Sequence, residues 1–380
     1  MLLLAVVLAA CEAAAPAAPS PAPSTTATAS PTLSPSPTSP PEVSVAFIQD
    51  LSSEGALERT LPALQAVELA AVTSSLEVDP VTIDVVSFDT QDDDATAAEI
   101  AGQIAGDPAY VAAIAAPDLA GQAELVDKLA AADVPLLSLS ARGAVESSPP
   151  GTWVRFVAPV EAQAKALADA VPTIRASRRG VCVVAAPPDG TRYARDVRRL
   201  LAASLTAIDI EDPSGVAAAV CGVALWTGAA EGGAELVASL GGGAILVGGP
   251  GLRNPRFLQL AGADAEGTIS FCSCADLSTS LDLAAQRFIQ DYQSEYGSPP
   301  GPYAVEAWDA AHLLIRALGE GGSTRAAIVA WLAATTAVDG LAGSYSFEGG
   351  ELVDPESAIR RFVVEGGRWE EVSPAGAAPA

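Results

Sequence analysis

Short apolar runs alternate with amphipathic stretches along most of the chain. In the first half, four runs rich in β-branched residues end in small or polar residues, at 43–48, 81–88, 110–115 and 134–139. Uninterrupted runs of this kind are typical of strands buried on both faces, as in parallel sheets. Between them, hydrophobic residues recur at helical spacing, as in Leu61, Leu64, Val67 and Ala71. The pattern predicts strands and helices in alternation.

The same alternation returns in the second half. Strands are expected at 180–185, 206–210, 222–226, 244–247 and 268–271, with helices near 160–174, 191–204, 231–240 and 281–296. After Gly301 the pattern changes to two helices and then strand-like segments, at 303–318, 323–335, 344–347, 359–364 and 368–372. The fold class is therefore α/β, with two doubly wound units.

The net charge and the residue counts exclude several classes of partner and of reaction. Its 380 residues suffice for two lobes with separate cores, and 46 acidic against 20 basic residues give a net charge of −26. Such a charge repels a phosphate backbone and an anionic lipid surface, so no nucleic-acid partner is expected. The chain has one histidine, His312, and no GxSxG serine motif, so we expect no catalysis. Neither a cofactor nor a metal ion is expected.

The N-terminal residues resemble a bacterial lipoprotein signal. Residues 1–10 are apolar after Met1 and end in Leu-Ala-Ala before Cys11, although no basic residue precedes them. The resemblance implies that Cys11 is lipidated and becomes the mature N-terminus. Residues 11–41 then form a Pro/Ser/Thr/Ala tether that is expected to be disordered, as is the tail 373–380. The protein is expected on the extracytoplasmic face of the membrane, attached through lipid only.

Several segments of the body resemble one family in the same order. They are Gly297 to Ala311, Val338 to Phe347 with Asp354-Pro355, the Ser52-Ser53 loop, Asp89 to Asp94, and Pro135 to Ala141. The chain is similar in these segments to the periplasmic substrate-binding proteins of branched-chain amino-acid ABC transporters. The resemblance implies a type I periplasmic-binding fold, in which two lobes joined by three crossovers close on a small-molecule ligand and present it to an ABC permease.

The resemblance also implies lobe boundaries. Lobe one is expected to comprise 43–157 and 277–340, and lobe two 158–276 and 341–372, with the glycine turn near Gly340 leading into a strand of the other lobe. The ligand is expected between them, because open parallel sheets bind ligands beyond the carboxyl ends of their strands.

The resemblance places a pocket whose chemistry departs from the family. Where amino-acid-binding members have Ser-Ala-Thr, this chain has Ser140, Ala141 and Arg142, and a guanidinium favours a carboxylate or phosphate. The family's acidic partner for the ligand's ammonium aligns with Pro250. The full set of ligand-binding candidates is Ser140, Ala141, Arg142, Pro117, Asp118, Asp189, Trp226, Gly228 and Pro250.

The departures leave two functions open. Loss of the ammonium partner weighs against a plain α-amino acid unless Asp189 or Asp118 replaces it, since an unpaired buried charge costs several kcal/mol. The first hypothesis is a solute-binding protein for an amino-acid-like or carboxylate ligand. The alternative is a sensing or interaction module of the same fold, with a degenerate pocket and no role in transport.

Two further clusters have structural interpretations. In an exported protein Cys182, Cys221, Cys272 and Cys274 indicate disulfides rather than a metal site. We favour Cys182 with Cys221 over pairs that involve Cys272 and Cys274, whose mutual bridge would be strained. The acidic run Asp92 to Asp94 is interpreted as a helix cap rather than a cation site.

Overall fold

The protein is described here as a computed structural model. The described residues are 42–52, 55–74, 82–117, 119, 122–141, 149–174, 180–184, 192–204, 208–210, 221–241 and 243–372. The predicted signal, tether and tail therefore lie outside the described residues, as do Cys11, Asp118, Arg142 and Asp189. Within the described part of the chain, no helix combines the length and the apolar character needed to cross a bilayer.

Lobe one is built on a parallel sheet in the order β2-β1-β3-β4-β5. Its strands are β1 (Glu42–Gln49), β2 (Thr82–Asp89), β3 (Tyr110–Ala115), β4 (Leu136–Ser138) and β5 (Trp153–Arg155). Alternate residues of β1 enter two different cores: Phe47 packs with one set of helices, and Ile48 with the other. Both faces of the strand are thus buried, which explains its unbroken apolar sequence.

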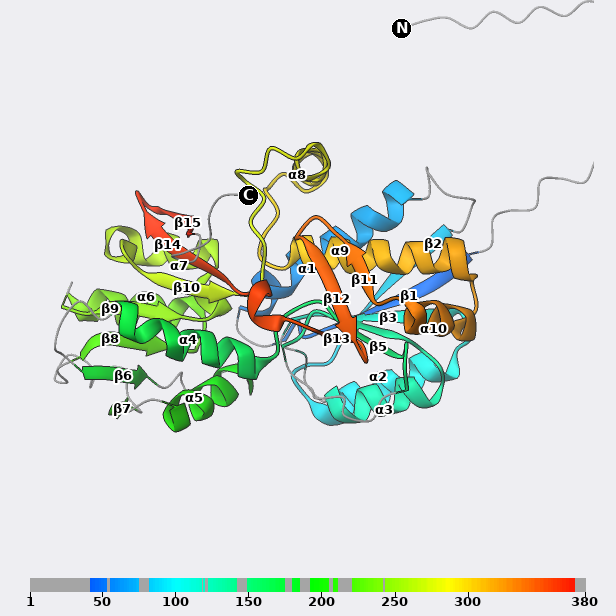
Figure 1. The fold of residues 1–380 in the computed structure, drawn as a ribbon, viewed down its shortest axis with the longest axis horizontal. Coiled ribbons are helices and arrows are strands. Elements are labelled where there is room, and N and C mark those ends of the chain that lie inside the picture. Colours follow the sequence, from blue (N-terminus) through cyan, green and yellow to red (C-terminus); the bar gives the residue numbers. More distant parts are fainter. Residues whose placement is uncertain are drawn as a thin grey trace, which may run out of the picture. The chain divides into compact units, whose positions relative to one another are not determined.

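Helices cover both faces of this sheet (Figure 1). On one face lie α1 (Ala56–Ser74) and α9 (Ala304–Arg316), and on the other lie α2 (Asp94–Gly106) and α3 (Gln122–Ala131). The acidic run before α2 acts as predicted, because Asp93 caps the helix by accepting a hydrogen bond from Thr96 N–H at 2.8 Å. Lobe one also contains α8 (Leu283–Tyr296), the π-helical turn η4 (Ala317–Gly321) and α10 (Arg325–Ala334).

Lobe two is built on a seven-stranded sheet in the order β15-β14-β10-β9-β8-β6-β7. Five strands are parallel, namely β6 (Gly180–Val184), β7 (Ile208–Ile210), β8 (Cys221–Trp226), β9 (Ile245–Gly248) and β10 (Ile269–Cys272). The hairpin of β14 (Arg360–Glu365) and β15 (Arg368–Val372) then adds antiparallel to β10. The last two strands of the chain therefore complete a sheet that begins near its middle.

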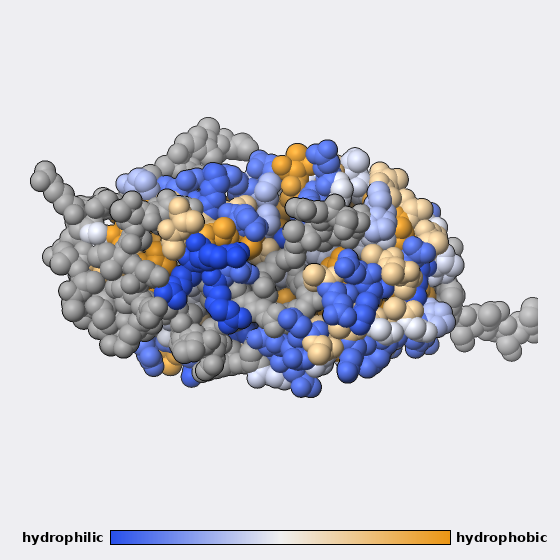
Figure 2. Space-filling model, turned by 90° about the horizontal axis from the view of Figure 1, so that it is seen from below, coloured by the Kyte–Doolittle hydropathy of each residue, from blue (hydrophilic) through white to orange (hydrophobic). Residues whose placement is uncertain are grey.

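Among the described residues of lobe two, four helices and two 3-10 turns accompany the sheet. They are α4 (Val160–Ile174), α5 (Arg192–Ser204), η2 (Pro250–Leu252), α6 (Ala230–Leu240), α7 (Pro255–Ala261) and η3 (Gly262–Ala265). Helix α5 buries Val197 and Leu201 in the core while the Arg199 side chain is 76% exposed. Figure 2 shows a strongly hydrophilic area on this lower face of lobe two.

A third, small sheet joins the lobes. It consists of β11 (Ala337–Asp339), β12 (Ser344–Glu348) and β13 (Glu351–Leu352), after which η5 (Pro355–Ala358) leads into β14. The boundary predicted at 340/341 is too early, because β12 and β13 pack on lobe one. Arg155 N–H donates to Gly350 O at 2.8 Å, and the rings of Phe156 and Tyr345 meet edge to face at 5.0 Å. The third crossover therefore follows Leu352.

Two disulfides lie among the described residues of lobe two. Cys182 on β6 is bonded to Cys221 on β8, the pairing that the sequence analysis favours. Cys272 is bonded to Cys274, which corrects the expectation that these two would not pair. Their Cα atoms are 5.1 Å apart, whereas two residues of extended chain span roughly 6.6 Å. The chain therefore bends at Ser273, where β10 has ended, and this bend brings the two cysteines within bonding range.

Candidate functional site

The loop after β4 carries the first two predicted pocket residues. Ser140 is fully buried, and its N–H donates to Ser138 Oγ at 3.1 Å. Ala141 O accepts from Val160 N–H at 2.9 Å and from Arg155 Nη1 at 3.0 Å. Each of these bonds fixes the loop at the carboxyl edge of the sheet, where ligands of open α/β folds bind.

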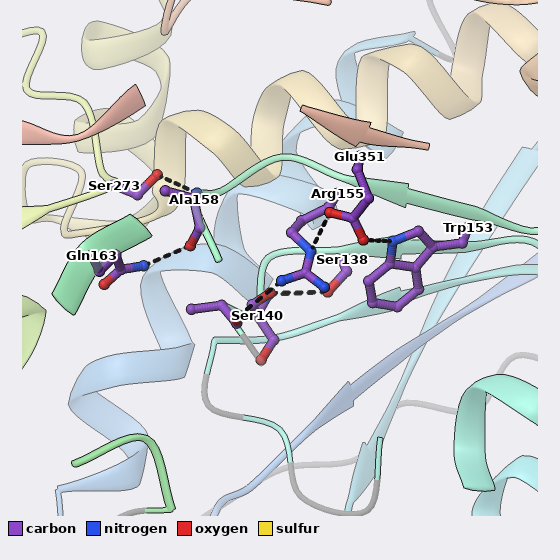
Figure 3. Close-up of polar contacts among 9 residues, drawn as sticks. Ser138, Ser140, Trp153, Arg155, Ala158, Gln163, Ser273 and Glu351 are labelled. Atoms are coloured by element: carbon purple, nitrogen blue, oxygen red, sulfur yellow. Dashed lines mark hydrogen bonds and ion pairs between the residues drawn. The ribbon is translucent and has the colours of Figure 1, made fainter. Parts of the chain in front are cut away.

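Arg155 holds this loop in place through its hydrogen bond to Ala141 O (Figure 3). Its guanidinium is 2% exposed and lies 3.0 Å from Glu351 Oε2, while Glu351 Oε1 accepts from Trp153 Nε1 at 2.9 Å. Burial lowers the pKa of Arg155 and raises that of Glu351, and each charge opposes the shift of the other. We assign Arg155 as a positioning residue that the sequence analysis missed, since its partner on β13 is almost two hundred residues away.

The polar network continues into the first crossover (Figure 3). Ala158 N–H donates to Ser273 Oγ at 2.8 Å, and Gln163 Nε2 donates to Ala158 O at 2.8 Å. Ser273 belongs to the second crossover, between the two bonded cysteines. Two of the segments that join the lobes are thus bonded directly to one another.

Lobe two presents its glycine-rich loops at the ends of β8 and β9. A Cβ built on Gly251 would lie 2.3 Å from Gly228 O, so the two loops approach closely only because glycine stands there. The loops that carry Gly228 and Pro250 are therefore neighbours.

Trp226 does not belong to that wall in this conformation. Its side chain is 1% exposed, its Nε1 donates to Ala229 O at 2.8 Å, and its ring packs against Gly232 of α6. Because the Trp226 ring is buried and its Nε1–H already has an acceptor, Trp226 is a core residue. This corrects the prediction that Trp226 contacts the ligand.

The two lobes meet at a small cavity that contains predicted residues from each. Pro117 of lobe one and Pro250 of lobe two line it together with Glu58, Arg59, Gly251, Arg253, Asn254, Pro302 and Tyr303. Its volume of about 20 Å³ is close to that of a single water probe. An amino acid or aromatic acid would therefore need the lobes to separate before it could enter.

Seven of the nine residues that line this cavity were not predicted, and two of them, Tyr303 and Arg253, have unusual features. Tyr303 caps α9 with a φ of +66°, a left-handed conformation that is rare for a bulky side chain and often marks functional positions. Arg253 pairs with Asp276 and places its guanidinium 4.3 Å from the ring centre of Phe362. No local sequence pattern signals either feature, because both depend on distant segments.

No group of three or more His, Cys, Asp or Glu side chains among the described residues could hold a metal ion. His312 stacks on Trp308 with ring centres 4.2 Å apart, and its Nδ1 lies 3.0 Å from Trp308 O. His312 is therefore a packing residue of α9.

Two doubly wound lobes, joined by crossovers and meeting at the carboxyl ends of their strands, define a bilobal ligand-binding protein. The model of the periplasmic binding protein family matches residues 42–355, and the chain belongs to that family. Its members bind ligands and are not enzymes.

Solved structures share this fold at low sequence identity. The Streptococcus pneumoniae LivJ, a branched-chain amino-acid transporter substrate-binding protein in complex with isoleucine, is 18% identical with a TM-score of 0.74, covering 88% of this chain and 100% of its own. A leucine-binding LivK from Thermotoga maritima is 16% identical with a TM-score of 0.72, covering 87% and 98%. A Rhodopseudomonas palustris solute-binding protein in complex with benzoate is 16% identical with a TM-score of 0.71, covering 87% and 95%. No curated protein matches in sequence.

Proposed function

We propose that this protein is the solute-binding lipoprotein of an ABC importer on the extracytoplasmic face of the membrane. Its lobes close on a small polar ligand, amino-acid-like or a carboxylate, and present it to the permease. The proposal rests on the small cavity between the lobes that Pro117 and Pro250 line together, which we call the seam. At the seam the ligand-binding edges of both sheets come together.

The small size of that cavity is also compatible with the alternative function, a sensing or interaction module. A space of about 20 Å³ holds no solute, so either the lobes open for a ligand or the pocket is degenerate and the protein is a sensing or interaction module. A thermal-shift screen with isoleucine, leucine and benzoate, extended to other small carboxylates and amines, separates the two. A melting temperature that rises with ligand concentration supports solute binding. A flat response to the whole panel favours the module.

Arg142 is the residue that we propose binds an anionic group of the ligand. It follows Ala141 directly, and Ala141 O is held in the loop after β4 by hydrogen bonds from Arg155 Nη1 and Val160 N–H. If Arg142 grips an anionic group of the ligand, Arg142→Ala should weaken binding by about 2 to 5 kcal/mol, the usual cost of removing one partner from a desolvated charged contact. Arg199→Ala on exposed helix α5 is the matched control. Equal affinities of both variants for a confirmed ligand would remove Arg142 from the site.

Membrane attachment is proposed to depend on Cys11. Cys11→Ser should move the protein from the membrane fraction to the soluble extracytoplasmic fraction, since the lipid on that thiol is the sole attachment proposed. Fractionation followed by immunoblotting measures the effect. A variant that still sediments with membranes contradicts the lipoprotein.

A further inference from the structure

A second cavity lies beside the crossovers, apart from the seam. It has a volume of about 380 Å³, and its wall includes Phe156, Ser273, Glu306, Tyr345, Asp354 and Arg360. None of its lining residues also lines the cavity at Pro117 and Pro250. The volume is within the range of small-molecule sites, which starts at roughly 300 Å³.

Glu306 is an unusual residue to find in such a wall. It is 4% exposed and lies in the first turn of α9. Its Oε1 accepts from Ala275 N–H at 2.7 Å, but its Oε2 is buried and accepts no hydrogen bond from the described residues. Buried polar atoms nearly always have a partner, and one without a partner points to a bound group that supplies it.

The other charged groups around Glu306 are already engaged. Asp309, one turn further along α9, accepts from Leu341 N–H, Ala342 N–H and Tyr345 Oη–H at 2.7 to 2.9 Å. Arg360 on β14 contacts Glu371 at 3.0 Å and donates to Ala342 O at 2.6 Å.

The remaining polar groups that line the cavity can accept hydrogen bonds. Asp354 adds a second carboxylate to the lining, and the hydroxyl groups of Ser273, Ser344, Ser346 and Ser357 add oxygens. With Arg360 already bonded to Glu371, a group that brings its own N–H donors and a positive charge complements this wall best. The net charge of −26 favours the approach of a cation from solution.

We propose that this cavity beside the crossovers binds a small organic cation through a primary ammonium group held by Glu306. The ammonium donates to Glu306 Oε2, and the Ser273 hydroxyl and the Asp354 carboxylate line the same cavity and supply further acceptors for its remaining N–H groups. The site is distinct from the seam and does not depend on the ligand of the seam.

Proton exchange accompanies this binding. Burial is the main cause that raises the pKa of Glu306 to about 8; the charge of Asp309 adds to the rise, and the hydrogen bond from Ala275 N–H and the charge of Arg360 oppose it. The carboxyl is therefore mostly protonated at neutral pH, while the bound ammonium requires the carboxylate. Affinity should consequently rise by about tenfold per pH unit below pH 8 and level off above it, in accordance with proton linkage.

Propylammonium chloride is a suitable probe, since an alkylammonium has a pKa near that of lysine, about 10.4, and stays charged over this range. We expect saturable binding with a Kd on the order of millimolar, because so few atoms cannot bind more tightly. Two isosteric controls separate the possible chemistries: 1-propanol lacks the charge, and sodium propionate reverses it. Titration of the full chain by NMR, at several pH values, measures all three.

Variants assign the binding to this cavity. Glu306→Gln should weaken propylammonium binding at least about tenfold and abolish its pH dependence. Glu348→Gln on β12, which is exposed and lines a different groove, should leave both unchanged. Ala358→Leu fills the cavity from η5 without touching Glu306, and it should block binding even if Glu306→Gln disturbs the fold.

Three results would overturn the proposal. They are the absence of saturable propylammonium binding, equal binding of 1-propanol or propionate, and binding that survives both Glu306→Gln and Ala358→Leu.

Discussion

Glu351 is the residue on which two buried donors of β5 depend. It pairs with Arg155 at 3.0 Å and accepts from Trp153 Nε1 at 2.9 Å, from strand β13, which directly precedes the third crossover. Arg155 in turn holds the loop of Ser140 and Ala141. A single carboxylate therefore links the path of the crossover to the wall of the candidate site.

Removal of that carboxylate should be costly. Glu351→Ala leaves the guanidinium of Arg155 buried without its counter-charge, and we expect the free energy of unfolding to fall by about 3 to 5 kcal/mol. Urea denaturation measures it. Glu348→Ala, an exposed carboxylate on β12, should change stability by less than about 0.5 kcal/mol. If Glu351→Ala behaves like this control, the ion pair does not contribute to the fold.

At the scale of single elements, helix α9 binds the second crossover and the turn before β12. Glu306 accepts from Ala275 in the second crossover, and Asp309 accepts from Leu341 and Ala342 at the glycine turn that precedes β12. A Cβ built on Gly340 would lie 2.4 Å from the Asp309 carboxyl carbon, so the turn fits closely around that side chain. Two acids on one helix thus define where two connecting segments run.

The pH dependence of stability should report these acids. Burial raises the pKa of Glu306 to about 8 from 4.5 and that of Asp309 to about 6 from 3.8. The folded state therefore binds protons more tightly than the unfolded state, and the stability that this contributes is lost as pH rises from about 4 through 8.

The melting temperature, measured from pH 5 to about 8.5, should decline less steeply in Glu306→Gln than in the unmodified protein. Glu348→Gln should keep the original slope. Parallel curves for Glu306→Gln and the unmodified protein would show that Glu306 titrates normally.

Close packing of loops gives a second prediction at this scale. Gly251→Ala would place a methyl group 2.3 Å from Gly228 O, so backbone must move, and we expect a loss of about 1 to 3 kcal/mol. Gly102→Ala is the matched control, since it lies inside α2 with no atom within 4 Å of the added Cβ. It should stabilise the protein by about 0.5 to 1 kcal/mol, in line with helix propensity. Chemical denaturation of both variants compares them; a tolerated Gly251→Ala contradicts the close approach.

At the scale of the whole molecule, the alternation of strands and helices was predictable because each buried strand is a continuous apolar run. The position of the third crossover was not. The sequence of β12 suits either lobe, and its assignment depends on contacts such as that of Trp153 with Glu351, which are 198 residues apart. The bend at Ser273 and the left-handed Tyr303 are equally invisible, because tertiary contacts rather than local propensity produce them.

The C-terminal hairpin has a consequence for the order in which the molecule can be assembled. Strand β14 pairs along β10, so the sheet of lobe two keeps an unpaired edge until residues 360–372 have been synthesised. Lobe one likewise awaits α9 and β12, which cover strands made much earlier. Neither lobe can fold to completion before its own last segment has been synthesised, and exposed strand edges invite aggregation in that interval. Lobe one is completed only by β12 and β13, and lobe two only by β14 and β15, so the chain must hold both sheets unfinished through most of its synthesis.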